Sequence, residues 1–254
     1  MTADQTKTGD KLRLDLVLVQ QGHFETRARA RDAVARGTVS VDGTVCKKPG
    51  IRINPGADLS VSDRAQSYVS RAALKLIAGL EAFGFDPGGR SVIDLGASTG
   101  GFSQVLLERG ASQVLAVDVG HDQLHPVVRD NPRLVSFEGL NARHLTQAGI
   151  GGRAFDAVVS DVSFISLRLA LPPSLALAEN GSFCVLLVKP QFEAGKDGLG
   201  KGGLLKDPAR GPEIAAELSD WLGSQAGWRS VGVHPSPIEG GDGNREFLLG
   251  GIKQ

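Results

Sequence analysis

The sequence predicts a Rossmann-like α/β fold, with a mostly parallel sheet and an antiparallel last strand, preceded by a small α+β module. Three observations lead to this prediction. Short apolar runs alternate with helical segments, which is typical of a parallel sheet covered on both faces. A glycine-rich turn follows the first of these runs, at residues 94–102. Two final strands, at 228–234 and 245–249, are separated only by a turn-rich stretch, so they can pair antiparallel.

The apolar runs that predict the parallel strands lie at 91–95, 113–117, 134–137, 155–160 and 182–188. A helix over 209–223 precedes the last two strands. Another helix is expected before the first strand, with Ser70 as its N-cap and with Leu74, Ile77 and Ala78 on its buried face.

The bulk composition indicates a globular protein. At 254 residues the chain can hold one large domain and one small one, and its hydrophobic content of 41% is sufficient for a core. The longest apolar run, Phe183–Val188, is too short to span a bilayer, and the first residues lack the apolar segment of a secretory signal. We therefore expect a cytoplasmic protein with no membrane contact. The two cysteines, Cys46 and Cys184, are too far apart in sequence to indicate a disulfide framework or a metal site.

The charge is unevenly distributed along the chain. Residues 1–64 hold 11 Lys+Arg against 8 Asp+Glu, whereas the whole chain has no net charge. We interpret residues 1–64 as a separate basic module, 62–67 as a linker, and 68–254 as the larger domain.

The basic module is predicted to contain two short helices and a hairpin. Thr26 fits the N-cap of the second helix, which ends before Gly37. Asp42-Gly43, between two β-prone runs, predicts a tight hairpin turn. The first helix is indicated by the helical spacing of Leu14, Val17 and Leu18.

Basic side chains gather on the second helix and just after the hairpin. They are Arg27, Arg29, Arg31, Arg36, Lys47 and Lys48. Such a cluster is either a solvated face or a surface that binds RNA phosphates. Because the net charge of the chain is zero, composition does not decide between the two.

The glycine-rich turn is a candidate cofactor loop, because glycines allow the backbone to approach a ligand closely. It lacks the Gly-Lys-Ser/Thr sequence of a P-loop and is therefore a poor cradle for a triphosphate. Asp118 ends the next strand, where a carboxylate can accept both hydroxyls of a ribose. A ribose without phosphates indicates S-adenosylmethionine rather than ATP. The candidate cofactor residues are Asp94, Gly96, Ser98, Thr99, Gly100, Gly101, Phe102, Asp118 and Val119.

Ionisable residues lie at the ends of the predicted strands, where open α/β sheets bind ligands. Asp161 follows the fourth strand, Lys189 follows the fifth and Glu246 opens the last; Lys75 lies on the helix before the first strand. A lysine can remove the proton of a sugar hydroxyl only when it is itself unprotonated, and burial or a second cation favours that form. We expect Lys189 to be the base, Asp161 and Lys75 to orient it, and Glu246 to position the ribose.

Other methyl acceptors fit the sequence less well. Methylation at cytosine C5 needs a nucleophilic cysteine, and Cys184 lies within a predicted strand. Methylation of an exocyclic amine commonly uses Asp/Asn-Pro-Pro-aromatic, whereas Asp161-Val-Ser-Phe164 lacks both prolines.

A glycine-rich stretch at 193–203 follows the fifth strand. It cannot bury enough apolar surface to order itself. It is therefore either a floppy connection or a mobile loop at the mouth of the site that meets RNA.

The basic module resembles the alpha-L RNA-binding motif found in a ribosomal small-subunit protein and in many rRNA-modifying enzymes. The similarity lies in Arg-Leu-Asp-Leu-Val-Leu-Val, which begins at Arg13, and in residues 27–43. This resemblance favours RNA contact over a solvated face, and it adds Arg13 to the candidate RNA-binding residues.

From about Lys11 to Lys253 the chain resembles the TlyA, or hemolysin A, family, which joins such a module to an FtsJ-like methyltransferase domain. The matching motifs lie at 68–76, 94–102, 116–120, 160–165, 188–192 and 243–247. The resemblance implies methyl transfer from S-adenosylmethionine to the 2′-hydroxyl of cytidine in ribosomal RNA, with ribosomal subunits as partners. The family's Lys-Asp-Lys-Glu tetrad would fall on Lys75, Asp161, Lys189 and Glu246. Ser98 replaces the second glycine of the general methyltransferase pattern, as is usual in this family.

Several alternatives remain open. The same fold can act on another RNA or on a base atom, and an RNA-binding protein can carry an inactive methyltransferase domain. The historical family name suggests a membrane-active protein, but the sequence shows no spanning segment. We expect a monomer that binds no metal.

Overall fold

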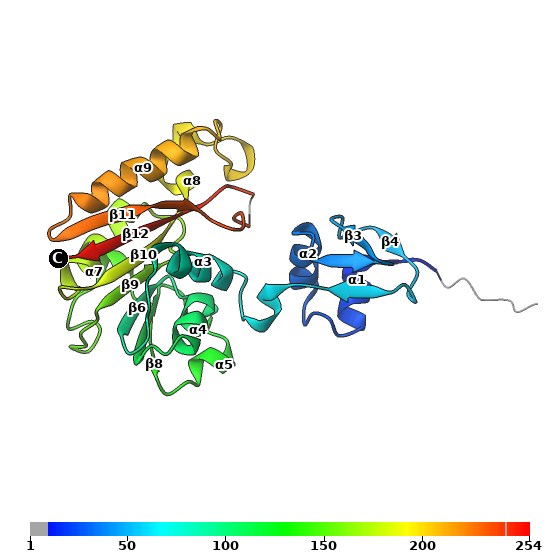
Figure 1. Cartoon of the computed structure of the whole chain (residues 1–254), viewed down its shortest axis with the longest axis horizontal. Coiled ribbons are helices and arrows are strands. Elements are labelled where there is room, and N and C mark those ends of the chain that lie inside the picture. The colour runs from blue at the N-terminus through cyan, green and yellow to red at the C-terminus, as the bar shows by residue number, and fades with distance from the viewer. Residues whose placement is uncertain (1–9, 242) are drawn as a thin grey trace, which may run out of the picture. The chain divides into compact units, whose positions relative to one another are not determined.

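The computed structural model describes residues 10–241 and 243–254, so the first residues, where no secretory signal was found, lie outside it. The chain divides after Ser67 into two compact units, and Figure 1 draws the elements of each. Each unit has its own core and is described by itself.

The N-terminal unit contains two short helices and small sheets around a core of leucine, valine and alanine side chains. Thr26 accepts a hydrogen bond from the backbone N–H of Arg29, which confirms the predicted N-cap. Asp42 and Gly43 have φ angles of 49° and 76°, as a tight hairpin turn requires. The elements are β1 (Leu12–Arg13), α1 (Leu14–Gln20), α2 (Arg27–Ala35), β2 (Val39–Val41), β3 (Thr44–Cys46), β4 (Arg52–Ile53), β5 (Leu59–Val61) and the 3₁₀ turn η1 (Arg64–Ser67).

The stretch 62–67 is not a free linker, in contrast to the sequence interpretation. Asp63 forms an ion pair with Arg36 at 2.7 Å. The guanidinium of Arg29 donates to the carbonyl of Ala65, and the amide of Gln66 donates to the carbonyl of His23. These contacts hold the stretch against the N-terminal unit, because they satisfy polar groups that a free linker would leave to solvent.

The larger unit is built on a seven-stranded sheet in the order β11-β12-β10-β9-β6-β7-β8. Five strands are parallel, and β12 pairs antiparallel with both β10 and β11. The predicted fold class is therefore confirmed. The strands are β6 (Ser91–Leu95), β7 (Gln113–Asp118), β8 (Leu134–Glu138), β9 (Ala157–Ser160), β10 (Phe183–Val188), β11 (Trp228–Pro235) and β12 (Phe247–Lys253).

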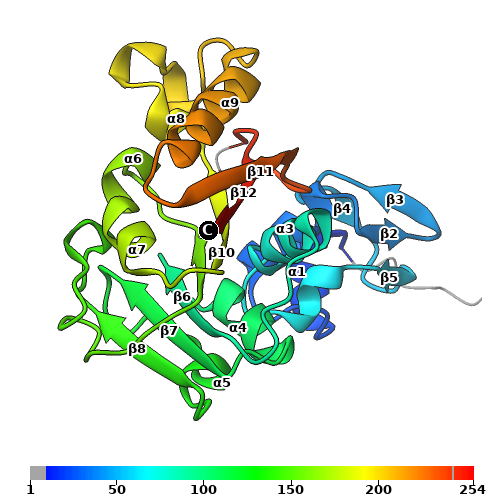
Figure 2. The same ribbon diagram turned by 60° about the vertical axis from the view of Figure 1, so that its left-hand side comes forward.

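Both faces of this sheet are covered, as Figure 2 shows. Val92 and Val114 point to the face that α3 and α4 cover, whereas their neighbours Ile93 and Leu115 point to the face of α7 and α9. Because successive side chains of a strand point to opposite faces, each strand contributes to the core on both sides of the sheet. The helices are α3 (Ala73–Phe83), α4 (Gly101–Glu108), α5 (Pro126–Arg129), α6 (Leu167–Ala170), α7 (Pro172–Leu177), α8 (Pro190–Glu193) and α9 (Arg210–Gly223), with 3₁₀ turns η2 (Ala142–His144), η3 (Lys196–Gly198) and η4 (Lys201–Gly203).

Two local predictions were wrong. Ser70 does not cap α3, because it accepts from the backbone N–H of Ala72 in a turn and the helix begins at Ala73. The last strand begins after Glu246 and extends to Lys253, beyond the predicted end. Among the described residues, no helix is long and apolar enough to cross a membrane.

Candidate active site

The candidate site lies where the parallel strands end. Asp118 is the last residue of β7, Asp161 follows β9 and Lys189 follows β10. Because β12 is antiparallel to β10, its first residue pairs with the last residue of β10, as Phe247 opposite Val188. This register brings Glu246 beside Lys189, although 57 positions separate them in the numbering.

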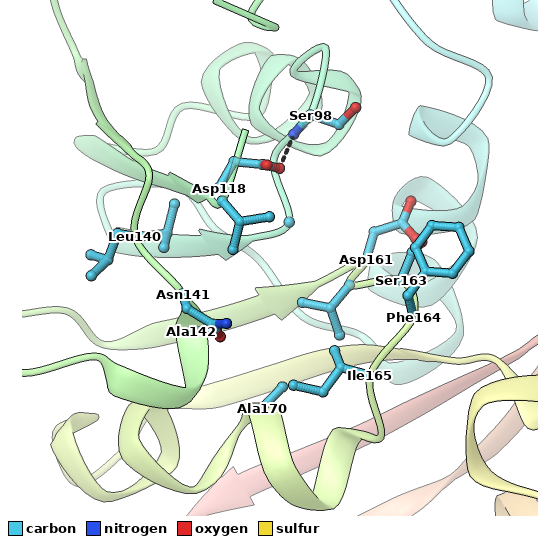
Figure 3. Close-up of a pocket in the computed structure, with 14 residues that line it drawn as sticks. Ser98, Asp118, Leu140, Asn141, Ala142, Asp161, Ser163, Phe164, Ile165 and Ala170 are labelled. Atoms are coloured by element: carbon cyan, nitrogen blue, oxygen red, sulfur yellow. Dashed lines mark hydrogen bonds between the residues drawn. The ribbon is translucent and has the colours of Figure 1, made fainter. Parts of the chain in front are cut away.

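A first cavity of about 500 Å³ opens beside the glycine-rich loop (Figure 3). Asp118 stands at its wall, and its carboxylate accepts hydrogen bonds from the backbone N–H groups of Ser98 and Gly120, each at 2.8 Å. The lining residues are Gly96, Ser98, Val117, Asp118, Val119, Leu140, Asn141, Ala142, Asp161, Val162, Ser163, Phe164, Ile165 and Ala170. We call this space the loop cavity.

Other predicted cofactor residues line a small adjoining cavity of about 80 Å³. Thr99, Gly101 and Phe102 line it, and it shares Gly96, Ser98 and Asp161 with the loop cavity. Asp94 and Gly100 line neither of these two spaces.

Two glycines of the loop are required by positive φ angles and by close packing around them. Gly96 has a φ angle of 81°, and a Cβ atom there would lie 3.0 Å from the backbone of Val162. Gly100 has a φ angle of 93°, and a Cβ atom would lie 2.9 Å from the side chain of Val128. The loop therefore needs glycine at these positions for its own conformation.

Asp94 is a buried carboxylate with an unused acceptor. Its Oδ2 accepts from the Ser103 hydroxyl at 2.6 Å, whereas Oδ1 has no hydrogen-bond partner among the described residues. Burial raises the pKa of Asp94 to about 7, against the opposing effect of the Ser103 hydrogen bond. A buried acceptor of this kind calls for a cationic or donor partner.

Asp94 should make the stability of the ligand-free protein depend on pH. Its pKa is about 7 in the folded state and about 4 when unfolded, so between these values the folded state binds more protons. The free energy of unfolding should therefore fall as the pH rises from about 4 to 7, by at most about 1.4 kcal/mol per pH unit from this group. Urea unfolding of wild type and Asp94→Asn over this range measures it. An identical pH dependence in both proteins would contradict the assignment.

The four predicted ionisable residues are brought together as two ion pairs. Lys189 Nζ lies 2.6 Å from Asp161 Oδ1, outside hydrogen-bond angles, and donates to the Ser163 hydroxyl at 2.7 Å. Lys75 Nζ donates to Glu246 Oε2 at 2.5 Å. Lys75 pairs with Glu246, and its expected role in orienting Lys189 stays a prediction.

Both pairs are largely removed from water. The side chains of Lys75 and Glu246 are 7% and 3% exposed. Burial raises the pKa of the Glu246 carboxyl, although the charges of Lys75 and Lys189 act in the opposite direction. Burying two such pairs costs desolvation free energy that hydrophobic residues would avoid, so they indicate a functional rather than a stabilising role.

A second large cavity, of about 550 Å³, adjoins these pairs; we call it the acceptor cavity. It shares Ser163 and Phe164 with the loop cavity. Its lining residues are Ser163, Phe164, Lys189, Gln191, Phe192, Leu199, Gly202, Gly203, Gly241 and Glu246. Ligands in the two cavities would therefore meet at the segment that follows β9.

Phe164 is a site residue that sequence reasoning did not identify as functional. Its side chain is 91% exposed, its φ angle is 64°, and its ring lies 5.1 Å from that of Phe192. An exposed aromatic residue in a strained conformation between two cavities indicates a binding role. Leu140 and Asn141 were also missed; their position after β8 could have indicated them.

Cys184 offers no nucleophile to this site. It lies within β10, is fully buried, and burial strongly raises the pKa of its thiol. The thiolate needed for attack on a cytosine ring is therefore disfavoured.

The glycine-rich stretch forms the turns η3 and η4. It does not need a core of its own, because Asn244 hydrogen-bonds it to the rest of the unit. These long-range contacts hold the stretch, and composition alone could not indicate them.

The predicted RNA-binding residues of the N-terminal unit differ in how available they are. Asp15 is fully buried and bonds to both Arg13 and Arg27, whose side chains stay 41% and 49% exposed. Arg36 is only 15% exposed and is held by Asp32 and Asp63. We therefore correct the sequence interpretation for Arg36, which has a structural role.

The other predicted RNA-binding residues also divide into cations that are held by the fold and cations that are exposed. Arg29 pairs with Glu25 and donates to the carbonyl of Ala65, so it also supports the fold. Arg31, Lys47 and Lys48 are exposed, and no ion pair joins them to another described residue. The available cations are Arg13, Arg27, Arg31, Lys47 and Lys48, which we call the basic set.

Comparison with known families identifies both units. Residues 68–253 match the model of the FtsJ-like methyltransferase family, and residues 12–59 match the S4 domain. A candidate hemolysin from Streptococcus thermophilus has a similar solved structure, with a TM-score of 0.74, 37% identity, and coverage of 96% of this chain and 89% of that one.

Named relatives are similar over nearly the whole chain. The 16S/23S rRNA (cytidine-2′-O)-methyltransferase TlyA of Mycobacterium tuberculosis is 44% identical over 94% of this chain and 89% of its own length. Hemolysin A of Brachyspira hyodysenteriae is 35% identical over 93% of this chain and 98% of its own. The chain belongs to the TlyA family, in which an S4 domain precedes an FtsJ-like methyltransferase domain.

Proposed function

We propose that this enzyme transfers a methyl group from S-adenosylmethionine to the 2′-hydroxyl of a cytidine in ribosomal RNA. The observation that carries the proposal is the pair of buried ion pairs, Lys189–Asp161 and Lys75–Glu246, beside a wall shared by two cavities. The similarity to the 16S/23S rRNA (cytidine-2′-O)-methyltransferase of Mycobacterium tuberculosis supports cytidine in ribosomal RNA as the acceptor.

The residues of the loop cavity fit S-adenosylmethionine. Asp118 uses one hydrogen bond on each oxygen and keeps lone pairs for two ribose hydroxyls. Asp94 lines neither cavity, so its pairing with the ammonium group of the methionine part stays a prediction that rests on its unused Oδ1. Apolar side chains for a purine ring come from Leu140, Ile165 and other lining residues. The cofactor supplies an electrophilic methyl group when it is bound.

Lys189 is the proposed proton acceptor. It lines the acceptor cavity, where, once its ammonium group has lost a proton to solvent, the neutral amine can hold the 2′-hydroxyl and take up its proton as the methyl group is transferred. Asp161, 2.6 Å away, stabilises the ammonium group that results. Glu246, fixed by Lys75, lines the same cavity beside Lys189 and positions the ribose there.

Two further contacts with RNA belong to this proposal. The exposed ring of Phe164 offers a surface on which the acceptor base can stack. The basic set of the N-terminal unit binds phosphates of the same ribosomal RNA. An enzyme with this substrate acts in the cytoplasm, where ribosomal subunits are found.

Mapping of 2′-O-methyl groups on ribosomal RNA tests the function directly. Purified subunits incubated with enzyme and S-adenosylmethionine should acquire 2′-O-methylcytidine, which subunits without enzyme lack. An RNA with 2′-deoxycytidine at the mapped position should give no product, because the acceptor oxygen is missing. Methylation of the deoxy substrate would show that a base atom is the acceptor and that the mechanism above is wrong.

A further inference from the structure

Asn244 ties the glycine-rich stretch to the short segment before β12 that also carries Glu246. Its side-chain Nδ2 donates to the carbonyl of Gly203 at 3.0 Å, and its Oδ1 accepts from the backbone N–H of Leu205 at 3.1 Å. The residue is only 4% exposed and lies two positions before Glu246. One amide group therefore satisfies two backbone groups about 40 positions away.

The segment that Asn244 holds is otherwise shaped by backbone hydrogen bonds among residues 196–206 and by the packing of Leu205 against the core. The backbone N–H of Gly200 donates to the carbonyl of Leu204, and Leu199 forms an isolated bridge with Leu205. Gly202 and Gly203 have φ angles of 74° and 78°, and no atom would lie within 4 Å of an added Cβ. Glycine is therefore needed here for conformation, while side-chain packing contributes nothing at these two positions.

This segment forms one side of the acceptor cavity. Leu199, Gly202 and Gly203 line it together with Lys189 and Glu246. Because Asn244 binds the backbone at both Gly203 and Leu205, a shift of the segment would break one or both bonds. The shape of this wall is thus coupled, through Asn244, to the backbone that positions Glu246.

We propose that Asn244 is a positioning residue that fixes residues 199–205 as the wall of the acceptor cavity and so determines how tightly the target nucleotide is bound. The inference rests on the proposed function, since it takes the acceptor cavity as the nucleotide site. Asn244 touches neither reacting atom in this assignment. Its loss should therefore raise the KM for RNA while it leaves cofactor affinity unchanged.

The test compares Asn244→Ala with wild type in the full-length enzyme. Hydrogen exchange of the peptide that contains the Leu205 amide should become about tenfold faster or more, since the variant loses the acceptor of that amide. The KM for ribosomal subunits should rise on the order of tenfold, with kcat changed much less and the dissociation constant for S-adenosylmethionine near wild type. The exposed Asn180, changed to alanine, is the matched control and should alter none of these values.

A second variant keeps the test valid if Asn244→Ala folds poorly. Gly203→Ala strains the backbone at a φ angle of 78° without touching the core, and it should raise the KM in the same way. Wild-type exchange of the Leu205 amide together with a wild-type KM in Asn244→Ala would overturn the inference. If wild type methylates no 2′-hydroxyl at all, the proposed function fails, whereas the exchange measurement still decides whether Asn244 holds the segment.

Discussion

Replacement of Lys189 by alanine should abolish measurable methyl transfer, with a loss on the order of 10²–10⁴ in the single-turnover rate. Lys189 lies in the acceptor cavity next to Asp161, and in its neutral form it is the assigned acceptor of the 2′-hydroxyl proton. The fold and the affinity for S-adenosylmethionine should stay near wild type, because Lys189 does not line the loop cavity. Rapid-quench assays on ribosomal subunits and calorimetry with the cofactor measure the two effects.

Lys189→Arg separates the charge from the proton transfer. Arginine can keep the ion pair with Asp161, but it stays protonated in proteins and cannot act as a base. The arginine variant should therefore be as inactive as the alanine variant while it remains folded. A wild-type rate in Lys189→Arg would falsify the role of Lys189 as proton acceptor and leave only a role in charge stabilisation.

Removal of the exposed cations of the basic set that hold no carboxylate in the fold should cause the second large loss, this time in RNA binding. Alanine at Arg31, Lys47 and Lys48 should weaken binding to ribosomal RNA and flatten its salt dependence by about one unit of slope for each phosphate that is no longer neutralised, whereas Arg13 and Arg27 stay in place because they pair with the buried Asp15. The reason is that each bound cation releases counterions from the RNA. Filter binding over a range of salt concentrations measures the slope, and cofactor titration should show no change.

Arg36→Ala provides the contrast to this variant. Arg36 is buried between Asp32 and Asp63, so its loss leaves a carboxylate without its partner and should destabilise the N-terminal unit. The salt slope of the folded fraction should stay close to that of wild type. An unchanged affinity and slope in the variant with alanine at Arg31, Lys47 and Lys48 would mean that these cations do not anchor the RNA.

The local elements of this protein were predictable because they depend on short-range signals. The strands of the larger sheet follow from apolar runs, and the hairpin of the N-terminal unit follows from Asp42-Gly43, whose positive φ angles the turn requires. The antiparallel end of the sheet was also predictable, because too few residues separate β11 from β12 for a crossover connection. Strand ends then indicated Asp118, Asp161 and Lys189 as site residues.

The partners of the charged residues were decided only by the tertiary structure. The sequence placed Lys75 near Lys189, but β12 lies next to β10 and brings Glu246 to Lys75 across 171 positions. Likewise, the sequence does not distinguish Arg36 from Arg31, but in the folded unit Arg36 forms an ion pair with Asp63.

Local sequence patterns also do not reveal which side chains are exposed or which form hydrogen bonds with distant segments. The solvent-facing ring of Phe164 depends on a left-handed backbone at one residue, and the two bonds of Asn244 depend on where a distant glycine-rich segment returns. The sequence by itself determined which elements form and which residue types stand at the strand ends. Their pairing, burial and orientation depend on the order of strands in the sheet, since contacts between residues far apart in the chain are set by packing rather than by neighbouring residues.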